Sequence, residues 1–152
     1  MNIYVMNMNL LTYITIGALI IWGIMLAKFK RISKIMALIG TVIAVYAVLS
    51  YTMIGRTPSS THTFAFFSSN KYEFKREMFM NVLLYVPFGM MISALVGSWT
   101  VLIAFILSLL IEIWQYKMGT GLAQGTDVIM NTIGALIGSL PCFIVKYIKT
   151  KV

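Results

Sequence analysis

The sequence predicts an all-α polytopic membrane protein, and three features of its composition and patterning support this class. Hydrophobic residues make up 60% of the 152-residue chain and charged residues only 11%, with a mean hydropathy of +0.90. These charges are too sparse to solvate the surface of a soluble domain of this size. The apolar residues form long continuous stretches rather than alternating ones, which favours helices over a β-barrel. We expect one domain, residues 1–152, with about five transmembrane helices.

Five apolar stretches are each long enough to cross a bilayer as a helix. They are Leu10–Ala27, Ile35–Ile54, Phe79–Gly97, Trp99–Tyr116 and Asp127–Ile148. The first two are joined by the basic segment KFKRISK, and the last two by the glycine-rich return Lys117–Thr126. The fifth stretch carries the pattern Gly134-xxx-Gly138, which suits close packing between membrane helices.

The basic residues predict the orientation of these helices, because lysine and arginine are retained on the cytoplasmic side of a membrane. Basic clusters lie at Lys28–Lys34 and at Lys146–Lys151. Five crossings place both clusters on one side, so we expect a multi-pass protein of the cell membrane with its N-terminus outside and its C-terminus cytoplasmic. The net charge of +8 is then explained by membrane boundaries and anionic lipid headgroups, and no nucleic-acid partner is expected.

The chain offers few groups for metal or cofactor chemistry. Its single cysteine, Cys142, excludes an intrachain disulfide. Its single histidine, His62, cannot supply the three or four ligands of a zinc site by itself. None of the patterns HExxH, P-loop, GxSxG or CxxC occurs in the sequence. We therefore expect neither a bound metal nor a cofactor.

Polar residues embedded in the apolar stretches gather at one depth, which the expected topology places near the outer membrane boundary. Ser108, Glu112 and Gln115 are spaced by four and then three residues, so they share one helix face. Asp127 and Asn131 share a face of the next helix in the same way. The candidate site has Glu112 and Asp127 as hypothetical catalytic residues, and Arg56, Arg76, Asn81, Ser108, Gln115 and Asn131 as binding residues.

Two interpretations of this polar group remain open from the residues alone. In the first it is a structural cap, in which the carboxylates pair with Arg56 or Arg76 and Asp127 caps its own helix. In the second it is a pocket for a headgroup, glycan, peptide or proton, since an acid within an apolar helix is costly without a partner or a function. We expect Glu112 and Asp127 to face one another, and two such carboxylates can also carry out acid–base chemistry.

Three sequence blocks carry a resemblance to a known family. The first is REMFMNVLLYVPFG at Arg76–Gly89, which has a basic residue, an asparagine and an apolar run ending in PFG. The second is S-x-x-x-E-x-x-Q at Ser108–Gln115, and the third is TDVIMNTIGALIG at Thr126–Gly138. In this order they resemble the VanZ-like family of small membrane proteins, and the likeness covers Arg56–Gly138. Many members have a further acid three positions before the aspartate, where this chain has Gln124.

The resemblance implies an envelope protein that lowers susceptibility to lipoglycopeptide antibiotics of the teicoplanin type. The expected partners are the lipid bilayer and, at the outward-facing polar site, a lipid-linked peptidoglycan precursor or a lipoglycopeptide. Two alternatives stay open. One is a membrane enzyme that uses Glu112 and Asp127 as acid and base on a lipid-linked envelope substrate. The other is a small proton-coupled transporter, which the lack of an internal repeat disfavours for a monomer.

Overall fold

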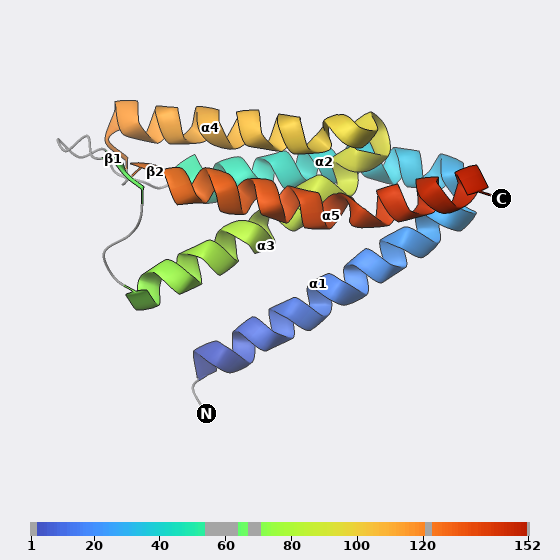
Figure 1. The fold of residues 1–152 in the computed structure, drawn as a ribbon, viewed down its shortest axis with the longest axis horizontal. Coiled ribbons are helices and arrows are strands. Elements are labelled where there is room, and N and C mark those ends of the chain that lie inside the picture. The colour runs from blue at the N-terminus through green and yellow to red at the C-terminus, as the bar shows by residue number, and fades with distance from the viewer. Residues whose placement is uncertain (1–2, 54–63, 67–70, 121–122, 152) are drawn as a thin grey trace.

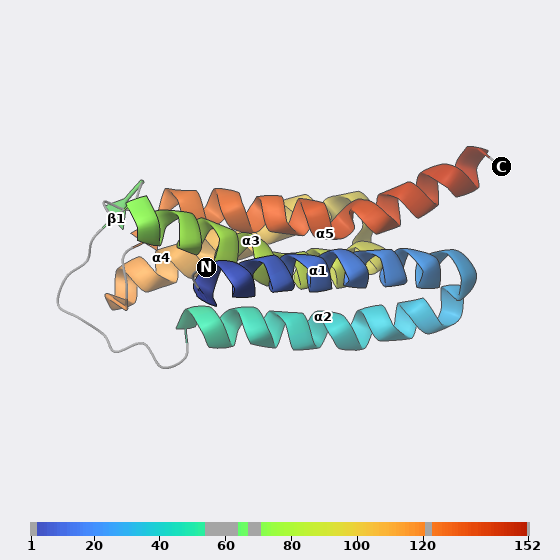
Figure 2. The same cartoon turned by 90° about the horizontal axis from the view of Figure 1, so that it is seen from below.

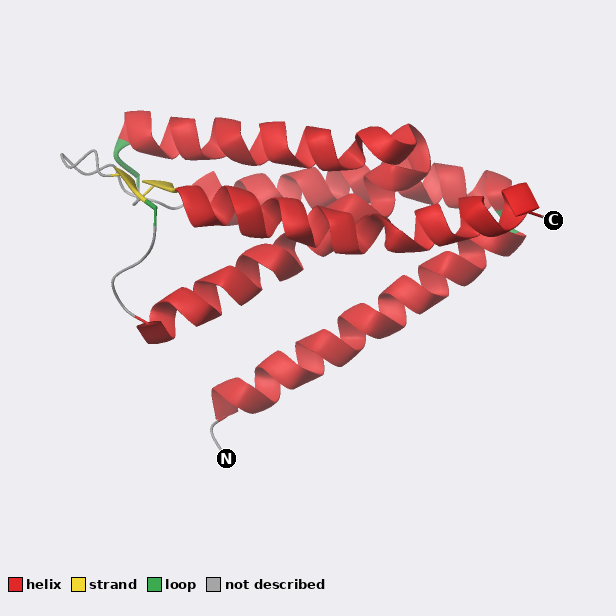
Figure 3. Ribbon diagram, in the orientation of Figure 1, coloured by secondary structure: helices red, strands yellow, loops and turns green. Residues whose placement is uncertain are grey.

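The computed structural model describes residues 3–53, 64–66, 71–120 and 123–151, and this part of the chain is almost entirely helical (Figures 1 and 3). Its α-helices are α1 (Ile3–Lys28), α2 (Lys30–Met53), α3 (Lys71–Val96), α4 (Thr100–Met118) and α5 (Gly125–Lys151). A 3-10 turn, η1 (Gly97–Trp99), joins α3 to α4, and the two short strands are β1 (Phe64–Ala65) and β2 (Ala123–Gln124). The all-helical class predicted from composition is confirmed.

Four helical segments of the described chain are long and apolar enough to cross a membrane. They are Leu10–Lys28, Arg31–Met53, Phe74–Met118 and Gly125–Lys151. The third segment is 45 residues long and contains α3 from Phe74 onward, η1 and α4. Gly97, at the start of η1, has a φ of 62°, a left-handed conformation that glycine adopts without a Cβ penalty. The chain reverses direction at this point (Figures 1 and 2).

The basic connection between the first two helices is itself largely helical. The amide of Phe29 donates to Met25 O at 2.8 Å, and the amide of Ser33 donates to Phe29 O at 2.9 Å. The Ser33 hydroxyl donates to the same carbonyl oxygen at 2.8 Å. Because Phe29 alone separates α1 from α2, the turn is tight and its basic side chains are held at one end of the bundle.

Successive helices run in alternating directions, which gives the bundle two chemically different ends (Figures 1 and 2). What we term the strand end holds β1 and β2, the ends of α2 and α4, and the beginnings of α1, α3 and α5. All four acidic residues of the chain lie there: Glu73, Glu77, Glu112 and Asp127. The basic end holds the α1–α2 turn and the last turns of α5. Its basic residues are Lys28, Lys30, Arg31, Lys34, Lys146, Lys149 and Lys151.

The most extensive packing in the bundle is between α3 and α5. Three glycines bring the two backbones into contact, because a Cβ at any of them would overlap the facing main chain. The pairs are Gly89 with Ala135, Gly134 with Val82, and Gly138 with Val86. Small residues are enriched at membrane helix interfaces for this reason. The predicted Gly134-xxx-Gly138 pattern is thus the α5 half of the α3–α5 interface.

An aromatic cluster beside this interface fills the centre of the bundle. Tyr85 and Phe88 are fully buried among Val48, Ile111 and Ala135. The two rings meet edge to face, with centroids 5.7 Å apart and an interplanar angle of 63°, an arrangement that aromatic pairs favour. The cluster joins α2, α3, α4 and α5, and it fixes the relative rotation of the helices that carry the polar residues.

The connection from α4 to α5 contains a short strand that was not predicted. Gly119 ends α4 with a φ of 60° and donates its amide to Gln115 O and Tyr116 O, which is a common way to satisfy the last carbonyls of a helix. Residues Ala123 and Gln124 then pair in parallel with Phe64 and Ala65 of β1. This pairing fixes the main chain of Gln124 immediately before the first turn of α5.

Candidate functional site

Glu112 is a buried carboxylate in the last turns of α4. Its side chain is only 7% exposed, and its Oε2 accepts a hydrogen bond from the main-chain amide of Gln124 at 2.9 Å. An acid in an apolar bundle is stable only when polar groups compensate for the water it has lost. Here β2 supplies such a group, because its extended backbone directs an N–H toward α4.

The other two polar residues on this face of α4 bind different elements of the bundle. The Ser108 hydroxyl accepts a hydrogen bond from Asn131 Nδ2 on α5 at 2.8 Å. Gln115 Nε2 donates to the carbonyl oxygen of Thr52, near the end of α2, at 3.0 Å. Ser108, Gln115 and Asn131 are all at least 96% buried. The polar face of α4 therefore links α2, β2 and α5 at the strand end.

Tyr85 is a member of this polar group that the sequence analysis did not select. Its ring is fully buried in the aromatic cluster, and its hydroxyl lies beside Ser108 and within electrostatic range of Glu112. The hydroxyl makes no hydrogen bond of good geometry with the described residues. The available signal was its spacing of four residues from Asn81, which places both side chains on one face of α3. An ordinary core tyrosine can show the same spacing.

Several buried oxygens around Glu112 make no hydrogen bond within the described part of the chain. Besides the Tyr85 hydroxyl, they are Gln124 Oε1, Thr120 Oγ1, Thr126 Oγ1 and Asn131 Oδ1. Buried polar atoms are usually satisfied, so such a concentration at one end of a bundle requires an explanation. Within the described residues these atoms retain hydrogen-bonding capacity: the two amide oxygens can only accept, whereas the three hydroxyls can donate as well as accept.

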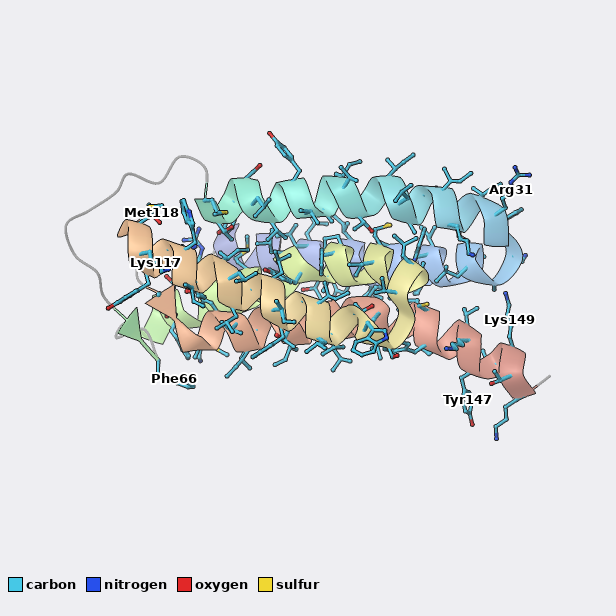
Figure 4. The ribbon with its side chains drawn as sticks, turned by 90° about the horizontal axis from the view of Figure 1, so that it is seen from above. Arg31, Phe66, Lys117, Met118, Tyr147 and Lys149 are labelled. Carbon is cyan, nitrogen blue, oxygen red and sulfur yellow. The ribbon has the colours of Figure 1, made fainter. Side chains whose placement is uncertain are left out.

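A groove of about 640 Å³ lies against this polar group. Its walls come from α4, β2, the beginning of α5 and Phe66. Glu112 and Gln124 are polar residues of the lining, Lys117 stands at the end of α4, and the other residues are mainly apolar. Figure 4 shows Lys117 and Phe66 at the strand end of the bundle. The apolar lining residues are Phe105, Leu109, Ile113, Tyr116, Ala123, Val128 and Ile129.

Three of the remaining predicted residues lie on α3 and at the beginning of α5. Asp127 is half-buried in the first turn of α5, and Asn81 is half-buried on α3. Arg76 is exposed on α3, and Arg56 lies outside the described residues. The hydrogen bond of Glu112 goes to the main chain three residues before Asp127. Because that donor is a backbone amide, the contact does not depend on which side chain stands at position 124.

Apolar helices with a buried polar group at one end define the class of this protein as a membrane-embedded helical bundle. The family model described as VanZ/LLP1 matches residues 10–146, so the chain belongs to that family. A relative named Protein VanZ, from Enterococcus faecium, is 37% identical over 67 residues, which is 41% of this chain. The matched stretch spans 42% of that relative. No solved structure matches the chain.

Proposed function

We propose that the chain crosses the membrane five times, with the segment Phe74–Met118 forming two of the crossings. Its 45 residues would be ~68 Å long as one helix at ~1.5 Å per residue, roughly twice the ~30 Å of a hydrocarbon core. The reversal at Gly97 supports two antiparallel crossings instead. The seven basic residues of the basic end favour a cytoplasmic location for it. The N-terminus and the groove would then be external, and the C-terminus cytoplasmic.

We further propose that the protein lowers susceptibility to teicoplanin-type lipoglycopeptides through the groove at the strand end. The observation that carries this proposal is the buried Glu112, held by the Gln124 amide at the polar part of a 640 Å³ apolar groove. Membership of the VanZ/LLP1 family supports it, as does the similarity to a protein named VanZ. In the proposed orientation the groove would lie near the outer boundary of the membrane.

The chemistry of the groove favours one class of ligand. Its polar part is rich in acceptors, with the carboxylate of Glu112 and the amide oxygen of Gln124, and the Asn131 amide oxygen is buried nearby. Such acceptors select hydroxyl, amide or ammonium donors. Its walls are apolar, which suits a hydrocarbon chain. A lipid-linked peptidoglycan precursor or a lipoglycopeptide has both donor groups and a hydrocarbon chain. We propose that the site binds one of them, with Asp127 of the first turn of α5 as a further acceptor.

Substitutions at Glu112 test this proposal. We expect Glu112→Ala to remove the teicoplanin resistance that the chain confers on a sensitive host, because loss of a buried acceptor costs about 1–3 kcal/mol of binding free energy. Glu77→Gln is the matched control, since Glu77 is an exposed acid at the same end. Resistance is measured as the inhibitory concentration of teicoplanin, and the amount of protein in the membrane is measured by immunoblotting.

The Glu112→Gln variant separates binding from acid–base chemistry. If the groove only binds its ligand, Glu112→Gln should keep part of the resistance, because the glutamine amide retains an acceptor oxygen in a side chain of similar size. An enzyme with Glu112 as an acid or base loses all function. If Glu112→Ala and Asp127→Ala both reach the membrane normally and both keep full resistance, the polar group is structural and the proposed site is wrong.

A further inference from the structure

A second pocket, of about 290 Å³, lies at the opposite end of the bundle from the groove. It is bounded by α1, α2, α3 and α5. Lys34 reaches it from α2, and Lys146 and Lys149 reach it from α5. Ser33 and Thr150 add hydroxyl groups, while the apolar part of the lining is Leu26, Ala94 and Val145. The pocket thus combines three cationic side chains with an apolar wall.

The charges of this pocket are not balanced by acids. All four carboxylate residues of the chain lie at the strand end, so no glutamate or aspartate lies among the basic residues of the basic end. Lys149 Nζ donates to Leu26 O at 3.3 Å, which draws this lysine over the last turn of α1. Figure 4 shows Lys149 extending from α5 toward the α1–α2 turn, whereas Arg31 points away from the bundle. All three pocket lysines are exposed, and all three line the same pocket.

An apolar groove lies next to this pocket and runs along the contact between α1 and α5. It has a volume of about 430 Å³ and includes Gly23 and Ala27 of α1 and Ile144 of α5. Val145 lines both the groove and the pocket. From Leu19 to Ala27 the groove extends ~12 Å along α1 at ~1.5 Å per residue. The groove could thus hold a hydrocarbon chain while the adjoining pocket holds a charged headgroup.

We infer that the basic end binds an anionic phospholipid, with its phosphate among Lys34, Lys146 and Lys149 and an acyl chain in the α1–α5 groove. Basic pockets between membrane helices are known binding sites for lipid phosphates. The apolar groove decides between the two sources of a phosphate group, since inorganic phosphate would make no use of it. This site is separate from the groove at the strand end, and the inference does not depend on the proposed role in resistance.

Lipid retention by the purified full-length chain tests the inference. The protein in neutral detergent is titrated with phosphatidylglycerol or with phosphatidylcholine of the same acyl chains, and bound lipid is counted by native mass spectrometry. We expect one phosphatidylglycerol to be retained in preference to phosphatidylcholine. The variant K34Q/K146Q/K149Q should weaken this binding by at least about tenfold, because each lysine near an anionic lipid contributes about a fivefold change in affinity.

The control variant K28Q/R31Q/K151Q removes the same number of charges from the same end but from outside the pocket. It should retain the lipid, within about a factor of three. A similar loss in both variants would mean that the preference reflects diffuse charge alone, and it would overturn the inference. Equal binding of phosphatidylglycerol and phosphatidylcholine by the unmodified chain would overturn it as well.

A pair of glycines on α1 tests the acyl-chain half of the site. Gly23 lines the groove, whereas nothing lies within 4 Å of a Cβ at Gly17. We expect Gly23→Phe to fill the groove and weaken phosphatidylglycerol binding severalfold, and Gly17→Phe to leave it unchanged. If Gly23→Phe has no effect and millimolar inorganic phosphate displaces the lipid, the pocket recognises a phosphate group alone and the lipid assignment is wrong.

Discussion

Individual polar residues show both what spacing can predict and where it fails. The four-and-three spacing of Ser108, Glu112 and Gln115 indicated one helix face, and all three are buried with partners on other elements. The donor to Glu112 could not be predicted, because it is the main-chain amide of Gln124 and a backbone group has no sequence signature. Its position depends on the β1–β2 pairing, which consists of too few residues to be recognised in a sequence.

The hydrogen bond between Ser108 and Asn131 gives a prediction at this scale. A double-mutant cycle of Ser108→Ala and Asn131→Ala should show a coupling of about 0.6–1.7 kcal/mol in unfolding free energy, as expected for interhelical hydrogen bonds in membranes. Thr132→Ala is the control, because the Thr132 hydroxyl donates to Val128 O of its own helix. Stability is measured by unfolding in mixed micelles. Equal coupling of Ser108 to Asn131 and to Thr132 would contradict the assigned contact.

Among the helices, α3 and α5 interact most closely, and their interface shows what a small-residue pattern can predict. Gly134-xxx-Gly138 indicated close packing on α5, but it did not indicate which helix would be the partner. Gly89 on α3 completes the interface against Ala135. A lone glycine has no periodic pattern, so its role emerges only when the helix crossing is known. Helix ends were predicted less well, since α2 begins within the basic connection at Lys30.

Alanine substitutions should lower the stability of the bundle at the two interface glycines of α5, but not at Gly17 of α1. We expect Gly134→Ala and Gly138→Ala to destabilise the bundle by about 1–3 kcal/mol, because the added Cβ would overlap the backbone of α3. Gly17→Ala should be neutral or stabilising by up to about 1 kcal/mol, since alanine is the better helix former and nothing lies near its Cβ. Thermal unfolding in detergent measures both effects. Unchanged stability of Gly138→Ala would refute the close backbone contact.

For the molecule as a whole, composition predicted the class reliably, because the ratio of apolar to charged residues leaves few alternatives in water. The number of crossings is harder to predict, since the reversal between α3 and α4 occurs within a continuous apolar segment of 45 residues. The turn is marked by the left-handed conformation of Gly97 and by the 3-10 turn η1 that begins there. The gathering of all four acids at one end emerged from the fold, because residues as distant as Glu77 and Asp127 had first to be brought to the same end.

Cysteine labelling tests the proposed five crossings. In a Cys142→Ser background, cysteines at the exposed positions Lys75 and Lys117 should react with an impermeant maleimide in intact cells. A cysteine at Lys151 should react only after permeabilisation. Lys75 and Lys117 lie at the two ends of the long segment, so labelling of just one of them in intact cells would mean a single crossing. The reverse pattern at all three positions would invert the proposed orientation.

The extensive pairing of α3 with α5 has a consequence for biosynthesis. The ribosome releases α3 and α4 before α5, so α3 emerges before its main packing partner. Glu112 leaves the ribosome with α4 before Gln124, its hydrogen-bond donor, has emerged. During that interval the carboxylate must remain near water, the lipid headgroups or the insertion machinery. Only arrival of the last helix closes the bundle, so a chain truncated before α5 would be a substrate for quality-control proteases.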